Sequence, residues 1–125
     1  MFTHVMVGSN DLAKSKKFYD AVFTAIGANS SVDMNGRLAY PHNGTNFLVT
    51  TPLNGEPASH ANGGTIGFSM DSPEQAKAWH DAGVAAGGTS CEDPPGLRDL
   101  GFAKYYLAYL RDPDGNKLCA LLQSD

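Results

Sequence analysis

Apolar residues recur at three- and four-residue steps in two stretches of the chain, and each stretch predicts an amphipathic helix. The first stretch runs from about residue 11 to 26, after Ser9 or Asn10 as a helix cap, and Gly27 follows it as a terminating residue. The second begins at Ser72-Pro73-Glu74-Gln75, which combines a capping serine, a proline at the first helical position and a glutamine that completes a capping box. It extends to about Ala86, and Gly83 is expected to weaken its interior.

Short apolar or alternating runs separated by turn residues predict strands in both halves of the chain. Asn35-Gly36 between two such runs is a strong hairpin signal, and Asp112-Pro113-Asp114-Gly115-Asn116 predicts a turn. Residues 52–64 predict a linker or flexible flap, and residues 93–102 a loop. The expected strands cover residues 2–7, 31–34, 37–40, 46–51, 65–70, 89–92, 104–111 and 118–122.

The two helices are near-copies of each other. Lys16-Lys17-Phe18-Tyr19-Asp20-Ala21 is echoed 61 positions later by Lys77-Ala78-Trp79-His80-Asp81-Ala82. The same offset carries His4 onto Thr65. We therefore expect one α+β domain over residues 1–125, built of two tandem β-α-β-β-β units: unit one at about 1–51, the linker at about 52–64 and unit two at about 65–125.

Composition limits the classes of partner. A chain of 125 residues with 42% hydrophobic and 18% charged residues is sized for one core. A net charge of −4 argues against nucleic acid or an anionic membrane as the main partner. No run approaches the roughly 20 apolar residues of a membrane span, so a cytoplasmic location is the simplest expectation. Cys91 and Cys119 are expected to be free thiols.

The chain resembles the vicinal oxygen chelate superfamily, which includes glyoxalase I, the bleomycin-resistance proteins, fosfomycin-resistance enzymes and extradiol dioxygenases. The resemblance rests on the ending Tyr109-Leu110-Arg111-Asp112-Pro113-Asp114-Gly115-Asn116-Lys117-Leu118, on the opening Phe2-Thr3-His4-Val5 and on Phe18-Tyr19. It implies that the two units curl into a sheet around a shared cavity, with the helices outside, and that the protein is a homodimer binding a small molecule.

The resemblance also implies a divalent metal cofactor, held by side chains on the first and last strands of each unit. The corresponding positions in this chain are His4, Leu48, Thr65 and Cys119. Only His4 has the imidazole that such metals favour, and a leucine and a neutral threonine hydroxyl are not ligands for a hard divalent cation. Two protein ligands, His4 and a Cys119 thiolate, fall short of the three usual in catalytic zinc sites.

These positions are the candidate site, and each has two interpretations. His4 is either an acid, base or metal ligand facing the cavity or a half-buried histidine bonded to the backbone. Cys119 is either a nucleophile activated by His4 or an inert buried thiol among leucines. Thr65 either contacts a ligand or bonds a neighbouring strand residue.

Further ligand contacts are expected from Arg98, Tyr106 and Tyr109. An arginine in the loop after Pro94-Pro95 could clamp a carboxylate or phosphate at the cavity mouth, or be solvated. One face of the tyrosine-rich strand should line the cavity. The leading hypothesis is a glyoxalase-like small-molecule enzyme, of lyase type or degenerate. The alternative is a protein that sequesters a small aromatic or cationic compound without catalysis, and a structural role is a third reading.

Overall fold

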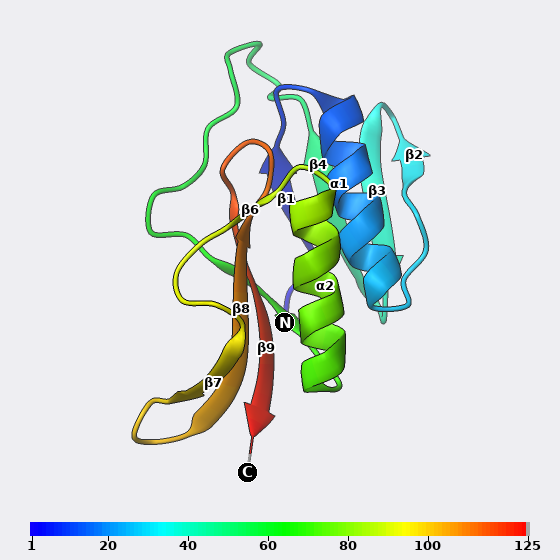
Figure 1. The fold of residues 1–125 in the computed structure, drawn as a ribbon. Helices are drawn as coiled ribbons and strands as arrows, with labels where there is room; N and C mark the ends of the chain where they lie inside the picture. Colours follow the sequence, from blue (N-terminus) through cyan, green and yellow to red (C-terminus); the bar gives the residue numbers. More distant parts are fainter. Residues whose placement is uncertain (125) are drawn as a thin grey trace.

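The structure, a computed structural model, describes residues 1–124 and contains both expected units (Figure 1). Unit one consists of β1 (His4–Gly8), α1 (Leu12–Ala25), β2 (Val32–Met34), β3 (Arg37–His42) and β4 (Thr45–Thr50). Unit two consists of β5 (Ile66–Ser69), α2 (Pro73–Ala85), β6 (Thr89–Ser90), β7 (Gly96–Asp99), β8 (Lys104–Arg111) and β9 (Lys117–Ser124). The α+β architecture of two units is therefore confirmed.

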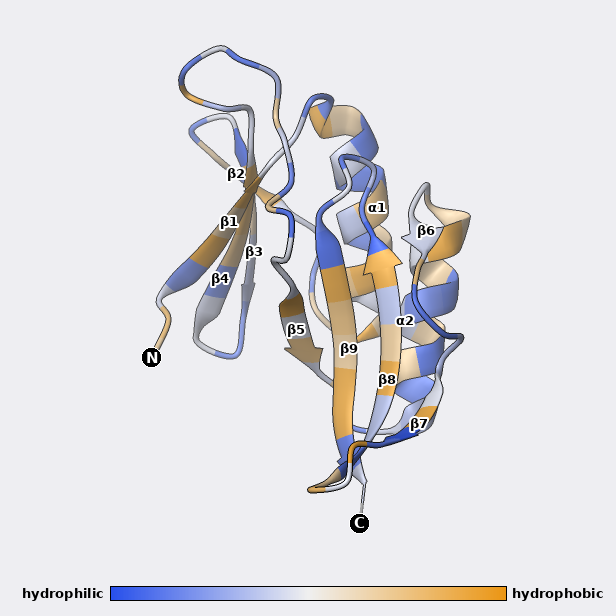
Figure 2. Cartoon of the chain, turned by 90° about the vertical axis from the view of Figure 1, so that its left-hand side faces the viewer, coloured by the Kyte–Doolittle hydropathy of each residue, from blue (hydrophilic) through white to orange (hydrophobic). Residues whose placement is uncertain are grey.

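Each unit forms its own mixed sheet, with its first and last strands side by side. In unit one the strand order is β1-β4-β3-β2, and in unit two it is β5-β9-β8-β6. The first strand runs parallel to the last in both sheets, while the remaining pairs are antiparallel. The sheets do not join, and Figure 2 shows them splayed apart with the helices packed against them.

The expectation of a plain loop over residues 93–102 was wrong. Residues Gly96–Asp99 form β7, which pairs antiparallel with the start of β8. A four-residue strand next to two prolines has no alternating pattern of its own, and only its partner β8 makes it a strand. The remaining differences are shifts of strand ends by one or two residues, typical of sequence-based boundaries.

Both helix starts use side-chain caps. The cap of α1 is Asp11, whose carboxylate accepts from the backbone N–H groups of Ala13 and Lys14, rather than Ser9 or Asn10. The hydroxyl of Ser9 instead accepts from the Asp11 N–H and bonds Ser15. The cap of α2 is Ser72, as expected, and it accepts from the Gln75 N–H, but the Gln75 side chain accepts from the Asp71 N–H rather than from that of Ser72.

One core joins the units, because α1 and α2 pack against each other and against both sheets (Figures 1 and 2). The repeated positions Phe18 and Trp79 are both fully buried. Gly83 lies at the crossing: an added Cβ would collide with Leu110 and sit 3.1 Å from a Val22 methyl group. The glycine expected only to weaken α2 therefore permits the close approach of α2 to β8 and to α1.

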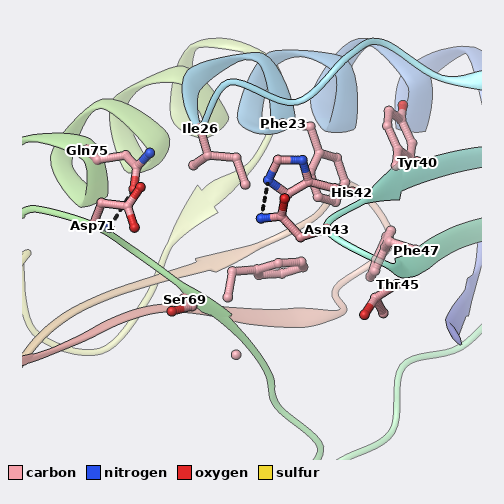
Figure 3. A pocket seen from close by; sticks show the side chains of 12 residues that line it. Phe23, Ile26, Tyr40, His42, Asn43, Thr45, Phe47, Ser69, Asp71 and Gln75 are labelled. Atoms are coloured by element: carbon pink, nitrogen blue, oxygen red, sulfur yellow. Dashed lines mark hydrogen bonds between the residues drawn. The ribbon is translucent and has the colours of Figure 1, made fainter. Parts of the chain in front are cut away.

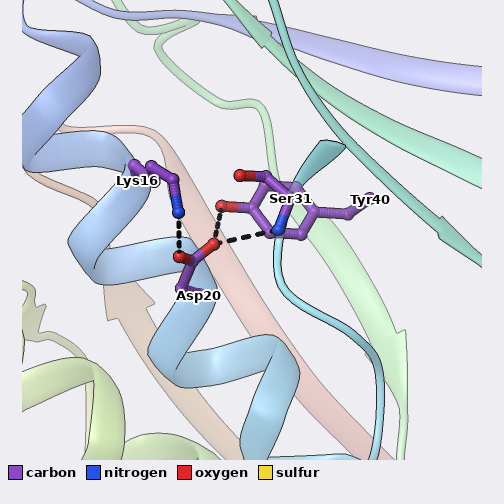
Figure 4. A network of polar contacts seen from close by, with 4 residues as sticks. All are labelled: Lys16, Asp20, Ser31 and Tyr40. Carbon is purple, nitrogen blue, oxygen red and sulfur yellow. Dashed lines mark hydrogen bonds and ion pairs between the residues drawn. The ribbon is translucent and has the colours of Figure 1, made fainter. Parts of the chain in front are cut away.

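A polar network fixes the helix of unit one to its sheet. Asp20 on α1 accepts from Lys16, from the Tyr40 hydroxyl at 2.7 Å and from the Ser31 N–H at 3.2 Å (Figure 4). Burial pushes the pKa of Asp20 up, but these three donors outweigh it and hold the pKa below its usual value. The network ties α1 to β3 through one carboxylate.

The turn between β8 and β9 reaches across to the start of α1. Asp112 accepts from the Tyr19 hydroxyl at 2.6 Å, and Asp114 accepts from the Asn10 N–H at 2.9 Å. The linker is tied to the same place, since Asn10 exchanges two hydrogen bonds with the Ala58 backbone. Among residues 1–124, no helix is long and apolar enough to cross a bilayer.

Candidate functional site

The side of each sheet away from the helices is open, and three of the four positions that correspond to the family's metal ligands lie there: His4, Leu48 and Cys119. In unit one the register pairs His4 with Asn46 and Met6 with Leu48, so these four side chains share one side of β1 and β4. With Met34 and Arg37 they line a hollow of about 300 Å³. We call this surface the unit-one face.

The unit-two face is built around β9. Gly67, Cys119 and Tyr109 lie side by side on β5, β9 and β8. An added Cβ on Gly67 would meet nothing within 4 Å, so there is free space beside Cys119. The Lys117 ammonium lies 5.0 Å from the centre of the Tyr109 ring and pairs with Glu92.

The register supports the alignment of the two units. Leu48 pairs with Met6, two residues beyond His4, and Cys119 pairs with Gly67, two residues beyond Thr65. The two last-strand positions are thus in equivalent places on their sheets. The repeat in the two helix sequences therefore extends to the strands.

Cys119 is held as a neutral thiol. Burial raises the pKa of the thiol, and contact with Tyr109 opposes this without outweighing it. The Cys119 thiol donates to the Ala120 carbonyl oxygen over 3.5 Å. Burial, and then the nearby negative charges of a Cys119 thiolate and Glu92, raise the pKa of Tyr109 to about 12. Neither group is poised to lose a proton near neutral pH.

His4 and Cys119 are on separate sheets. The hollow that His4 lines contains only unit-one residues, and the imidazole Nδ1 bonds the Thr3 hydroxyl at 2.9 Å. Thr65 lines a different hollow of about 320 Å³ between β1, the linker and β9. The residues predicted to share one cavity therefore lie in three places. His4 and Leu48 lie together on the unit-one face, Thr65 lines the second hollow, and Cys119 is on the unit-two face.

The donor set does not fit a divalent metal. Among residues 1–124, no three histidine, cysteine, aspartate or glutamate side chains gather closely enough to hold an ion. His4 has Met6, Asn46 and Leu48 around it, and none of these is a carboxylate or imidazole.

Tyr106 and Tyr109, which the sequence analysis grouped, lie on opposite faces of β8. Three positions apart on a strand, their side chains must point to opposite sides. Tyr106 packs against the core beneath α2, while Tyr109 lies on the unit-two face, as does Tyr105 opposite Gln123. Tyr105 therefore takes the place expected for Tyr106.

Arg98 belongs to β7 and pairs with Tyr105. Its guanidinium donates to the Pro94 carbonyl oxygen at 2.6 Å, which fixes it over its own loop. Its positive charge lies close enough to Tyr109 to favour the ionised phenol slightly. The arginine is therefore at the border of the unit-two face, with one of its nitrogen atoms already occupied.

The two units also share a pocket that sequence reasoning missed (Figure 3). It has a volume of about 340 Å³ and lies between the end of α1, the β3–β4 turn, β5 and the start of α2. We call it the inter-unit pocket. No local motif marks it, because its walls come from five separate elements, α1, β3, β4, β5 and α2. Its lining consists of Phe23, Ile26, Tyr40, His42, Asn43, Thr45, Phe47, Gly67, Phe68, Ser69, Asp71 and Gln75.

Comparison with known proteins agrees with this geometry. The family model of the Glyoxalase/Bleomycin resistance protein/Dioxygenase superfamily matches residues 1–120. The chain belongs to this superfamily. A search of the curated proteins found no match.

Solved structures of the superfamily share the whole fold. A glyoxalase/bleomycin resistance protein from Albidiferax ferrireducens T118 is 58% identical, with a TM-score of 0.94, and the match covers 97% of this chain and 98% of that one. A glyoxalase-related enzyme from Fulvimarina pelagi is 19% identical, with a TM-score of 0.73 and coverage of 97% and 86%. A glyoxalase/bleomycin resistance protein/dioxygenase family enzyme from Burkholderia phytofirmans PsJN is 17% identical, with a TM-score of 0.71 and coverage of 95% of each chain. The last two show the fold alone.

Proposed function

We propose that this superfamily member binds an apolar or aromatic small molecule on its open faces, without a divalent metal. The observation that carries the proposal is the pairing of Met6 with Leu48 and of Gly67 with Cys119. It puts uncharged side chains, Leu48 and Cys119, at the two last-strand positions, where a metal site would need charged or imidazole ligands. Tyr109 and Tyr105 add aromatic surface for a ring to stack on.

A homodimer completes this site in our proposal. The open faces leave large apolar side chains in solvent: Met6, Val32 and Met34 in unit one, and Leu121 in unit two. The helices hold the two faces of one chain apart. A second copy that lays its unit-two face over the unit-one face would cover these side chains and enclose the ligand between them.

We also place the protein in the cytoplasm, because Cys91 and Cys119 are both free thiols. A reducing compartment keeps such thiols unpaired.

Ligand binding is tested by thermal shift against a panel of aromatic antibiotics and thiol conjugates. A ligand that binds only the native state raises the unfolding midpoint. We expect a saturable rise that is lost in Leu48→Glu, which puts a charge in the unit-one hollow, and kept in Glu56→Gln in the linker. The absence of any rise across the panel, or an equal rise in Leu48→Glu, would contradict the proposal.

Dimerisation is tested separately by light scattering of the purified chain. We expect twice the monomer mass, falling to one mass in Met6→Glu. A monomer at all concentrations would remove the composite site while leaving ligand binding by a single face open to the thermal-shift test.

A metal-free lyase-type reaction is the second candidate, and the His4 imidazole favours it. Its Nδ1 is oriented by Thr3, and its Nε2 has no hydrogen-bond partner among the described residues. A proton-transfer role would leave the ring exposed in this way. Turnover of a bound ligand that disappears in His4→Gln, with binding retained, would establish it.

A further inference from the structure

We propose that the inter-unit pocket is a second ligand site, for a small planar heteroaromatic lactam. It goes beyond the function proposed above, because apart from Gly67, which borders both sites, its lining residues differ from those of the open faces. The pocket has an aromatic floor, a polar rim and one wall made by a free strand edge. Its volume of about 340 Å³ lies at the lower end of the usual range for ligand pockets, roughly 300–1,000 Å³.

The floor is a triangle of phenylalanine rings from three elements. Phe23 of α1, Phe47 of β4 and Phe68 of β5 have ring centres 5.5 to 5.6 Å apart. Phe23 and Phe47 are buried, and all three line the pocket. The rings are tilted against one another by 55° to 82°, so the core ends at this pocket in an aromatic surface on which a planar ring can pack face-on or edge-on.

The free strand edge belongs to β5. The Met70 N–H donates to the Leu121 carbonyl of β9, whereas the next N–H, of Asp71, turns the other way and bonds the Gln75 side chain. Successive residues of a strand direct their backbone groups to opposite edges. Gly67 and Ser69 therefore direct their N–H and C=O groups away from β9. Within residues 1–124, β5 has β9 as its only strand partner, so these groups are left for a ligand.

A donor and an acceptor side by side select the class of ligand. An extended residue offers its N–H and C=O together on one edge, and a lactam offers a C=O and an N–H at matching positions on a ring. An unsatisfied backbone group in a partly closed pocket is costly, so pairing it contributes to binding. A purely apolar ring would leave the strand edge unpaired.

The rim closes the pocket around such a ring. His42 and Asn43 of the β3–β4 turn bond each other at 3.2 Å on one side, and Asp71 and Gln75 stand on the other (Figure 3). No hydrogen bond or ion pair of the Asp71 carboxylate is present among the described residues. It can accept from a ring amino group. The small volume of the pocket, about 340 Å³, favours a compact ligand over an added strand.

The test uses carbostyril, a fused bicyclic lactam, as the probe, with N-methylcarbostyril as its matched control. Titration into the isotope-labelled full chain is followed by the backbone amide resonances. We expect saturable shifts of Gly67, Ser69 and Asp71, with the N-methyl compound binding at least about tenfold more weakly because it lacks the donor, a difference of about 1.4 kcal/mol.

Two variants separate this pocket from the rest of the surface. Thr45→Trp places a bulky side chain in the pocket from an exposed strand position, and we expect it to abolish the shifts. Thr89→Trp makes the same change at an exposed residue of β6 outside the pocket, and we expect the shifts to persist.

Three results would overturn the proposal: no saturable shift, equal binding by both compounds, or shifts that survive in Thr45→Trp. Saturation by a short extended peptide but not by carbostyril would also overturn it and identify strand addition instead. Shifts at Tyr109 and Cys119 alone would assign the probe to the open face. The open-face function could then hold while this proposal fails, and the reverse outcome is equally distinguishable.

Discussion

The Tyr19 hydroxyl donates to Asp112 over 2.6 Å, which joins the first helix to the turn before the last strand. Both residues are buried, and the Asp112 carboxylate also accepts from the Asn116 side chain and from the backbone N–H groups of Asp114 and Asn116. Burial, and then the charge of Asp112, raise the pKa of Tyr19 well above its ordinary value, so it stays a donor. The Asp-Pro-Asp-Gly-Asn motif is thus an interlock between the units.

Tyr19→Phe should destabilise the protein by about 1–3 kcal/mol, because it removes one donor from a buried carboxylate that stays charged. Urea unfolding followed by circular dichroism gives the free energy of unfolding. Tyr105→Phe, on the open face and without such a bond, is the control and should cost little. Equal stabilities of the two variants would show that the interlock contributes nothing.

Gly83→Ala should destabilise the protein, although alanine is the better helix former. The propensity gain is about 1 kcal/mol, whereas the new methyl group would collide with Leu110 in a packed core, at a cost of typically 1–3 kcal/mol or more. The thermal midpoint measures the outcome. Val84→Ala changes the exposed neighbouring residue and should leave the midpoint nearly unchanged. A higher midpoint for Gly83→Ala would mean that Leu110 and the residues around it can accommodate the methyl group without loss.

Stability should fall as the pH drops below about 6.5, with His80 as one cause. Burial lowers the pKa of His80, and the negative charge of Asp81 opposes this shift without outweighing it. The His80 Nε2 bonds the Ser90 hydroxyl at 2.9 Å. Between the unfolded pKa of roughly 6.5 and the lower folded pKa, the unfolded state takes up a proton that the folded state does not. The stability linked to this group is therefore full above the unfolded pKa and is lost as the pH falls through that window.

The measurement compares free energies of unfolding at neutral and mildly acidic pH. His80→Gln should show a smaller loss than the unaltered chain, and His60→Gln, at an exposed linker residue, should show the same loss. A pH dependence unchanged by His80→Gln would assign the acid sensitivity to other groups.

Cys119 should react slowly with iodoacetamide near neutral pH. Its raised pKa leaves little thiolate, and the thiolate is the reactive form. In a Cys91→Ser background, mass spectrometry should show slower alkylation of Cys119 than of free cysteine, because a higher pKa leaves less thiolate. Reaction as fast as that of free cysteine would revive the nucleophile hypothesis, which depends on a depressed pKa.

Protein purified without chelator should carry well below one equivalent of nickel, zinc, manganese or iron. The four positions that correspond to the family's metal ligands supply one imidazole, His4, and one neutral thiol, Cys119. A catalytic zinc site usually has three protein ligands. Elemental analysis measures the content, with His4→Ala as the matched variant. A stoichiometric metal that is lost in His4→Ala would contradict the metal-free proposal.

Local chemistry in the sequence was enough to place both helices, most strands and the repeat. Ser72 and Pro73 mark the start of α2, and Asn35-Gly36 forms a turn with positive φ at both residues, 54° and 83°. These features depend on a few adjacent residues. The short strand β7 could not be found this way, because pairing with β8 supplies its backbone hydrogen bonds.

The candidate site was harder to predict because it depends on faces and on distance. Alternation on β8 requires Tyr106 and Tyr109 to separate, yet only the contact of Tyr106 with the core shows which of them faces out. Equally, the repeat paired His4 with Thr65 by position, but nothing in the sequence shows that the helices pack together and hold the open faces apart. The inter-unit pocket has no sequence signal for the same reason.

The contact of Asp112 and Asp114 with unit one limits how the chain can be divided. A fragment ending at residue 51 would lack acceptors for the Tyr19 hydroxyl and the Asn10 N–H, while the remaining fragment would keep Asp112 and Asp114 without the donors that unit one supplies. Neither fragment should fold alone, but the two expressed together should reassemble, which makes the linker a natural cut site for a split reporter. Although the sequence repeats one motif, we expect the whole chain to unfold as a single cooperative unit.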